Sequence, residues 1–241
     1  MPNFALVNND DHQDVRVITE RSAKYGDNVM YALTFPFEFR SVQAFYPILF
    51  HNDAKGNPYP IALFGFQEGE NLFLDDSGWD ARYVPAMIRR EPFLIGYQGS
   101  EDQEDGEKVR VLSLDMDHPR VNREEGEALF QPLGARTPFL DDIAELMENI
   151  YRGYEHNKAL MAALQEHGLL ESVIMDITLD DGSKNQLQGF HTIDEQKLQQ
   201  LPGNVIEEFW KQQILMPIFM VLASTKNIRN LIDRKNAQRG A

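Results

Sequence analysis

The stretch TPFLDDIAELMENIYRGYEHNKALMAALQEHG, residues 137–168, predicts the longest helix of the chain and, with the strand-like runs around it, the fold class. Thr137 can cap the first turn, and Pro138 fits the first helical position because its missing amide is not needed there. Gly168 is a typical C-terminal cap. Between these ends, apolar residues recur with helical periodicity over about seven turns. They are Phe139, Leu140, Ile143, Leu146, Met147, Ile150, Tyr151, Tyr154, Leu160, Met161 and Leu164.

The residues before this helix read as strands. Short runs rich in β-branched and aromatic residues are separated by Gly, Pro, Asn or Asp. These runs predict strands at residues 15–19, 29–35, 47–50, 61–66, 71–74, 93–98 and 108–116. The acidic residues 99–107, between the last two runs, predict a solvated hairpin loop.

After the long helix, the pattern predicts a second set of elements. Residues 172–179 and 184–190 favour a two-strand unit joined by a DDGS turn. Asp194 can cap a short helix that runs through Leu201. A final helix opens at Asn204, and we expect Pro217 to kink it because proline removes an amide donor from the helix interior.

Together these elements predict an α+β fold, a mostly antiparallel sheet from the N-terminal half packed by two long helices from the C-terminal half. We expect one domain over residues 1–241. Its strand-rich part is 1–135, and its helix-rich part, 136–241, contains the two-strand unit.

Composition excludes several classes of function. The chain has 241 residues and no cysteine, which rules out disulfides and thiolate metal sites. A formal net charge of −15 argues against a nucleic-acid partner. The longest apolar run, Ile214 to Ala223, is too short for a membrane span, which needs about 20 residues. The N-terminal residues do not resemble a secretory signal, so we expect a soluble, acidic, cytoplasmic protein.

The segment GENLFLDDSGWDARYVPAMIRREPF, residues 69–93, concentrates chemistry-bearing side chains. Its DDSG sequence, residues 75–78, predicts a turn. Pro85 can begin a short helix that runs to Glu91, and Pro92 ends it. A strand–turn–helix–strand unit therefore explains most of the segment without any ligand.

Five side chains of this segment remain for binding: Trp79, Arg82, Tyr83, Arg89 and Arg90. Guanidinium groups pair with carboxylates and phosphates, so the arginines could clamp an anion or a peptide carboxylate beside the two aromatic rings. Aromatic residues of the first sheet would extend such a surface. The competing interpretation is structural, with Trp79 and Tyr83 covering the core and the arginines serving the end of the short helix.

A metal site is the alternative. His51 and Asp53 have the H-x-D spacing of a site with two histidines and one carboxylate, with His118 or His191 as a distant third ligand. This triplet lies in a sequence typical of an exposed turn. We predict no cofactor for the binding hypothesis. Nucleotide-binding glycine motifs and the G-x-S-x-G nucleophile motif are absent from the sequence.

Several blocks together resemble the SapC family of bacterial proteins. They are FPFEF (35–39), VQAFYPILF (42–50), residues 60–93, residues 167–202 and LASTKNIRNLIDR (222–234). The resemblance spans essentially the whole chain and implies a role connected with surface-layer (S-layer) proteins or peptide export. It implies no catalytic residues. A membrane permease of peptide-uptake systems shares the short name, and this chain has no span for that role.

The leading hypothesis is therefore a non-catalytic, cytoplasmic accessory protein that binds a peptide or a surface-layer protein partner. The first alternative is a metal-dependent enzyme, a non-haem iron oxygenase or a hydrolase, that uses His51 and Asp53. The second is a structural subunit that forms a homodimer through its kinked C-terminal helix.

Overall fold

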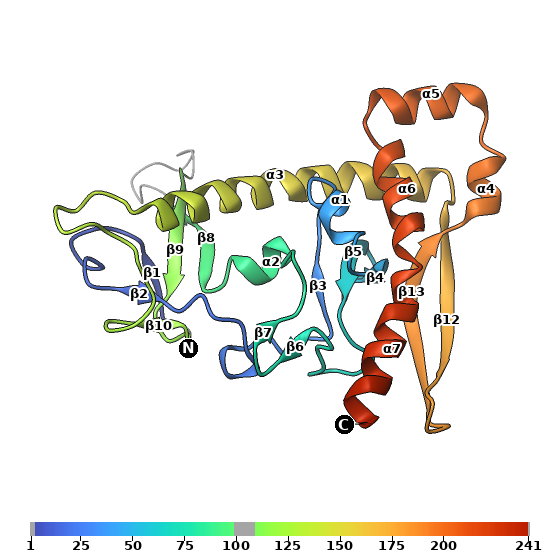
Figure 1. Cartoon of the computed structure of the whole chain (residues 1–241). Helices are drawn as coiled ribbons and strands as arrows, with labels where there is room; N and C mark the ends of the chain where they lie inside the picture. The colour runs from blue at the N-terminus through green and yellow to red at the C-terminus, as the bar shows by residue number, and fades with distance from the viewer. Residues whose placement is uncertain (1–2, 99–108, 241) are drawn as a thin grey trace.

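The computed structural model describes residues 3–98 and 109–240, and helix α3 (Pro138–Glu166) is its longest element. The Thr137 side chain accepts a hydrogen bond from the Leu140 amide at 3.3 Å, and Gly168 adopts a φ of 61° just after the helix. Both predicted caps are confirmed. Figure 1 shows α3 running along one side of the molecule and bridging its two halves.

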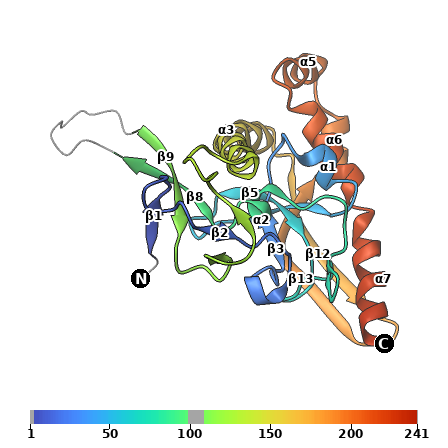
Figure 2. The same ribbon diagram turned by 60° about the vertical axis from the view of Figure 1, so that its left-hand side comes forward.

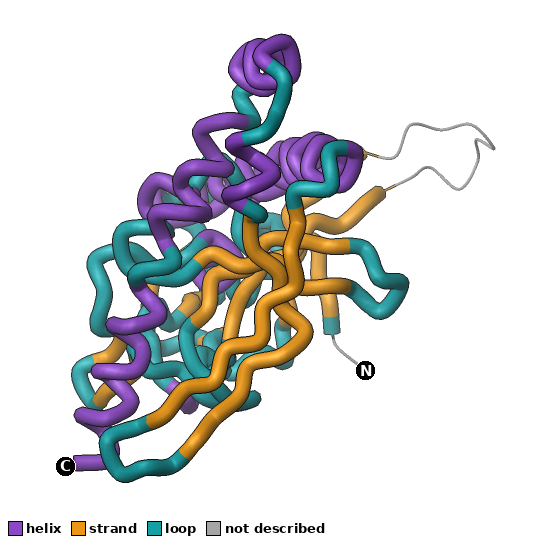
Figure 3. Tube along the Cα trace, turned by 90° about the vertical axis from the view of Figure 1, so that its right-hand side faces the viewer, coloured by secondary structure: helices purple, strands orange, loops and turns teal. Residues whose placement is uncertain are grey.

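A five-stranded antiparallel sheet forms the larger half. Its order is β12 (Leu170–Thr178), β13 (Lys184–Ile193), β4 (Ile48–Asn52), β5 (Pro58–Leu63) and β3 (Tyr31–Leu33). The two-strand unit predicted after the long helix is thus β12 and β13, and it joins the N-terminal strands through the pairing of Phe190 with His51. Figure 3 shows this long hairpin at the edge of the sheet. The sheet therefore combines strands from both halves of the sequence.

Smaller sheets form the other half and the connections. One has the order β1 (Phe4–Leu6), β9 (Val109–Asp115), β8 (Phe93–Gln98), and another β10 (Val121–Asn122), β2 (Arg16–Val17), β11 (Glu127–Ala128). The hairpin of β6 (Leu74–Asp75) and β7 (Gly78–Trp79) completes the set. All these pairs are antiparallel, which confirms the α+β class. The predicted acidic loop at 99–107 lies outside the described residues.

The helical region after residue 194 begins with the expected short helix, α4 (Glu195–Gln199), but the single kinked helix expected after it is divided into three. These are α5 (Gly203–Lys211), α6 (Leu215–Ser224) and α7 (Asn227–Gly240). Asp194 caps α4 as predicted, accepting from the Lys197 amide at 3.0 Å. The chain turns sharply at Gln213, which has a φ of 61°, so that Pro217 falls in the first turn of α6. The predicted kink at Pro217 is wrong because the helix has already ended, and a proline costs no hydrogen bond in a first turn.

Three short helical elements lie between the N-terminal strands. They are the 3-10 helix η1 (Ala23–Tyr25) and the helices α1 (Phe39–Val42) and α2 (Ala86–Arg89). In Figure 1, α6 and α7 descend along one end of the five-stranded sheet, and α5 projects beyond the body of the molecule. None of the helices among the described residues is long and apolar enough to cross a membrane.

Among the described residues, two hydrophobic clusters make up the core, and α3 contributes to both. Its first half packs with the small sheets through residues such as Ile143 and Ile150, and its second half packs on the five-stranded sheet through Leu160 and Leu164. Figure 2 shows α3 nearly end-on above the junction of the two halves. That the chain is a single domain stays a prediction.

The middle of α3 is fitted closely to the sheet. A Cβ atom on Gly153 would lie 2.6 Å from the ring of buried Phe35, so only glycine permits this approach. One turn later, the buried Asn157 side chain donates a hydrogen bond to the Thr34 carbonyl at 3.0 Å. The two contacts fix the helix over the end of β3.

Candidate functional site

The segment 69–93 forms the predicted turn and short helix. Asp75 Oδ1 accepts hydrogen bonds from the amide and hydroxyl of Ser77 at 2.7 and 2.6 Å, and Gly78 takes a φ of 111°. Pro85 then precedes α2, which is shorter than the expected helix of residues 85–91. The backbone of this segment is thus explained by its turn chemistry.

Trp79 and Tyr83 meet at a third aromatic residue, the buried Tyr46. Trp79 Nε1 donates to the Tyr46 hydroxyl at 2.7 Å, and that hydroxyl donates to the Tyr83 carbonyl at 2.5 Å. Burial raises the pKa of Tyr46, so its hydroxyl stays protonated. The polar groups of both predicted residues are therefore used within the fold.

Tyr83 also reaches the buried carboxylate of Glu38. Its hydroxyl donates to Glu38 Oε2 at 2.7 Å, and the same oxygen accepts from the Ala86 amide at 2.8 Å. The Thr34 hydroxyl donates to the other oxygen at 2.8 Å. Burial raises the pKa of Glu38 in spite of these hydrogen bonds, which act in the opposite direction. Glu38 joins the start of α1 to the start of α2.

The three arginines of the predicted site have different surroundings. Arg90 donates to the Phe93 carbonyl at 2.8 Å and pairs with Glu91 at 2.9 Å. Arg89 is exposed, and its charge lowers the pKa of the Tyr83 hydroxyl, against the larger effect of burial. Arg82 is exposed as well. The structure thus joins Trp79 and Tyr83 through Tyr46 and brings Arg89 near Tyr83. Ligand binding by these five residues stays a prediction.

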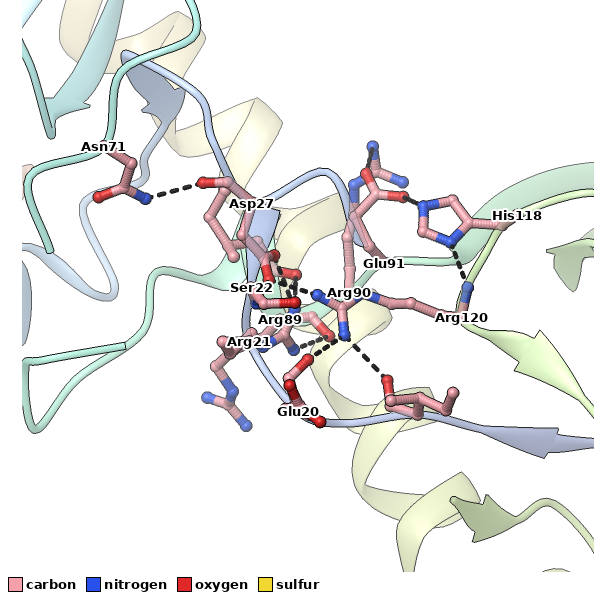
Figure 4. Close-up of polar contacts among 12 residues, drawn as sticks. Glu20, Arg21, Ser22, Asp27, Asn71, Arg89, Arg90, Glu91, His118 and Arg120 are labelled. Atoms are coloured by element: carbon pink, nitrogen blue, oxygen red, sulfur yellow. Dashed lines mark hydrogen bonds and ion pairs between the residues drawn. The ribbon is translucent and has the colours of Figure 1, made fainter. Parts of the chain in front are cut away.

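A buried charge network lies behind Arg89 and Arg90. Arg120 is fully buried, and its guanidinium lies 2.5 Å from the Asp27 carboxylate, which is only 3% exposed. Arg21 approaches the same carboxylate at 3.4 Å, and the Ser22 amide donates to it at 2.8 Å. Figure 4 shows how these residues converge on Asp27. The network joins the residues on both sides of η1 to the loop before β10.

The sequence did not reveal this network because Asp27 and Arg120 are 93 positions apart. In the sequence, the only indication of a buried ion pair was the single arginine Arg120 within a segment of strands and turns. Burial and the neighbouring charge of Arg120 lower the pKa of Arg21. Both carboxylate oxygens of Asp27 have partners within the protein, which is typical of an ion-pair network that stabilises the fold.

The residues of the metal alternative occupy β4, its turn and β13. His51 pairs with Phe190 across the sheet, so the next residue, His191, points to the opposite face from His51. His51 Nδ1 contacts the Gly189 carbonyl at 3.0 Å. Asp53 organises the turn by accepting from the Lys55 and Asn57 amides at 2.8 Å.

Within residues 3–98 and 109–240, no group of three His, Asp or Glu side chains is placed to hold a metal ion. The enzyme hypothesis stays a prediction. Stoichiometric iron or zinc in the purified chain, lost in a His51→Ala variant, would support it, and metal bound equally by both forms would count against His51 as a ligand.

A different surface offers room for a ligand. A groove of about 520 Å³ is lined by residues at the start of α1, on α3 and at the elbow that joins α5 to α6. Most of its lining is apolar: Pro36, Phe37, Ala159, Leu160, Trp210, Ile214, Leu215, Met216, Pro217 and Met220. Its polar lining consists of Arg40, His156, Gln212 and Gln213.

Large side chains of this groove are open to solvent. Trp210 is 64% exposed, Phe37 and Met216 are each 42% exposed, and Phe219, three residues after Met216 on α6, is 50% exposed. Phe37 is held in place by stacking on the buried ring of Phe35, with ring centres 5.6 Å apart. A contiguous set of exposed apolar side chains is typical of a surface that binds a partner.

The sequence contained one signal for this groove. The run from Ile214 to Ala223 is apolar on every side of a helix, which is more than one buried face can use. In the structure Ile218 and Val221 face the core, and Met216 and Phe219 face solvent. The other half of the groove comes from α1 and α3, which are far away in the sequence, so its walls were not predictable.

Comparison with known proteins leads to one family. The family model described as SapC matches residues 7–231, which include the groove, the buried charge network and the segment 69–93. No curated protein and no solved structure matches the chain. Because the match covers nearly the whole sequence, the chain belongs to the SapC family.

Proposed function

We propose that this SapC-family chain is a non-catalytic accessory protein of the cytoplasm that binds a peptide or a segment of a surface-layer protein. The groove between α1, α3 and the α5–α6 elbow is the binding surface. The five residues predicted in segment 69–93 form a second candidate surface, which the experiments below separate from the first.

The exposed apolar lining of the groove carries this proposal. Its volume of about 520 Å³ falls within the range of about 300–1,000 Å³ that ligand pockets occupy. Trp210 and Phe37 present large rings to solvent at the two sides of the groove. Covering such rings with apolar side chains of a partner would contribute about 25 cal/mol for each Å² removed from water.

A peptide screen tests the proposal. The purified full chain is panned against a random heptapeptide library, and enriched peptides are then titrated while the fluorescence of Trp210 is followed. We use a Trp79→Phe background so that Trp210 is the only tryptophan, and a peptide that binds the unmodified chain but not this background is assigned to segment 69–93. Binding at the groove should shift this emission to shorter wavelength and protect Trp210 from a soluble quencher.

Two variants locate the site. Met216→Asp places a charge in the groove at an exposed position, and we expect it to weaken binding at least tenfold because the charge must be desolvated. Leu133→Asp is the matched control, since Leu133 is 98% exposed and lies outside the groove. Equal peptide affinities of the two variants would refute the assignment of the groove as the binding site. Loss of binding only in an Arg82→Ala/Arg89→Ala variant would transfer the site to segment 69–93.

The location and the partner need an experiment in the native cell. A photo-crosslinking residue in place of Trp210 should become attached to a surface-layer protein or its precursor, recovered in the cytoplasmic fraction. Attachment to another class of protein, with no surface-layer protein among the products, would refute that choice of partner.

A further inference from the structure

The charged side chain in the groove lining, Arg40, is opposite in sign to the chain as a whole. The chain carries 38 Asp and Glu residues against 23 Lys and Arg, yet in the part of the chain that the structure describes no carboxylate lines the groove. Acidic residues next to it on the same helices have partners, and Glu208 on α5 accepts a hydrogen bond from Gln212 of the lining at 2.8 Å. Glu155 pairs with Lys158 on α3, and Glu207 pairs with Lys211 on α5.

Arg40 is the strongest charge in the groove lining. Its neighbour Glu38 turns inward, where the Tyr83 hydroxyl and the Ala86 amide hold the carboxylate away from Arg40. Across residues 3–98 and 109–240, Arg40 has no carboxylate partner, and its side chain is exposed. A guanidinium at the edge of an apolar groove is suited to a carboxylate, because it can donate two parallel hydrogen bonds to the two oxygens.

The elbow adds groups that match a peptide backbone. Gln213 is exposed at the turn, and its side-chain amide can both donate and accept hydrogen bonds. The exposed imidazole of His156 on α3 supplies another polar group to the lining. Apolar walls, amide groups and an uncompensated cation together fit an apolar peptide that carries a negative charge.

We infer that the groove selects apolar peptide segments that bear a carboxylate, and that Arg40 binds this carboxylate. This inference rests on the proposed function and names the chemistry of its ligand. The carboxylate can be a free C-terminus or an Asp or Glu side chain, and both sources present the same two oxygens to Arg40.

Paired peptide libraries test the inference. Random heptapeptides with free C-terminal carboxylates and the same library with amidated termini are panned against the full chain and against an Arg40→Gln variant. Peptides enriched on the unmodified chain should combine apolar residues with a terminal or side-chain carboxylate. Neutralising that carboxylate in an enriched peptide should weaken binding about tenfold, as expected for a charge-assisted hydrogen bond at a partly open site.

The Arg40→Gln variant tests whether Arg40 binds the carboxylate of the peptide. In Arg40→Gln the preference for the carboxylate should disappear, whereas binding of the amidated peptide should stay unchanged. An Arg136→Gln variant serves as the control, since Arg136 is exposed and lies outside the groove. It should keep the full preference. A variant Arg40→Gln that retains the preference would overturn the assignment of Arg40.

Other outcomes separate this inference from the proposed function. Enriched peptides that are neutral or basic, yet lost in Met216→Asp, would leave the proposed function standing and overturn the anionic ligand. Failure of both libraries to yield a groove-dependent peptide would overturn both proposals. Tighter binding of dodecanoate than of any enriched peptide would assign the groove to a small amphiphile. If light scattering shows a dimer that Met216→Asp dissociates, the groove binds a second copy of the chain and the anionic-peptide ligand is overturned.

Discussion

The buried pair of Asp27 and Arg120 permits the sharpest test of how this fold is held together. Asp27→Asn replaces the carboxylate by an amide of nearly the same shape and removes its charge. The Arg120 guanidinium is fully buried and would then have no counter-charge from this position. Its hydrogen bonds to the carbonyls of Ile18 and Glu20, at 2.9 and 2.5 Å, would remain.

The size of the effect follows from the burial. Removing one partner of a buried ion pair costs about 3–5 kcal/mol, because the remaining charge stays uncompensated in the interior. The two retained hydrogen bonds place our expectation at the lower end, about 3 kcal/mol. Since the total stability of a domain is about 5–15 kcal/mol, such a loss is easily measured.

Urea unfolding, followed by circular dichroism, measures the change. The midpoint should fall without a change in slope, so that the difference reports stability alone. Asp233→Asn is the matched control, because the pair of Asp233 and Arg229 is largely exposed, and such pairs contribute less than about 1 kcal/mol. Equal losses in the two variants would refute the reasoning. A double variant, Asp27→Leu with Arg120→Met, should recover part of the loss because the fully buried guanidinium is removed together with its carboxylate, while Arg21 keeps its hydrogen bond to the Ile88 carbonyl.

Two further predictions concern α3 and Glu38. Gly153→Ala should destabilise the fold by about 1–3 kcal/mol, because its new Cβ would overlap the ring of Phe35. The control is Gly203→Ala, which has open space around it and should leave the stability unchanged in the same urea assay. Equal stabilities of the two variants would show that the Phe35 ring moves aside. The raised pKa of Glu38 means that the folded state holds this proton more tightly than the unfolded state. The stability that Glu38 contributes to the fold is therefore fully present below the ordinary pKa of 4.5 and is lost as pH rises through the folded pKa. Stability measured against pH should therefore decline less steeply above that value in Glu38→Gln, and parallel curves for the two proteins would contradict the assignment.

Local chemistry in the sequence was enough to predict many elements. Thr137, Asp194 and Gly168 mark helix ends because capping depends only on a side chain or a φ angle and the next few residues. Strand β8 has the predicted bounds of 93–98. The final helix was mispredicted at Gln213, because a left-handed conformation at a residue other than glycine has no clear sequence signal.

The candidate sites were less accessible to such reasoning. The aromatic and basic residues of segment 69–93 are neighbours in the sequence, but Trp79 and Tyr83 hydrogen-bond to Tyr46 and Glu38, which belong to another part of the chain. The groove was hinted at only by the excess of apolar residues in α6. Neither arrangement could be deduced from spacing, because both depend on how distant elements pack.

The sequence by itself determined the class of fold, the positions of most helices and strands, the absence of thiol chemistry and the family. These properties follow from periodicity, capping, composition and the order of sequence blocks along the chain, all of which are local or additive. Only the tertiary structure decided that Arg120 is buried against Asp27, that His51 and His191 face opposite sides of a sheet, and that Arg40 and Trp210 line one groove. Each of these depends on contacts between residues far apart in the chain, and such contacts are set by the packing of the whole core.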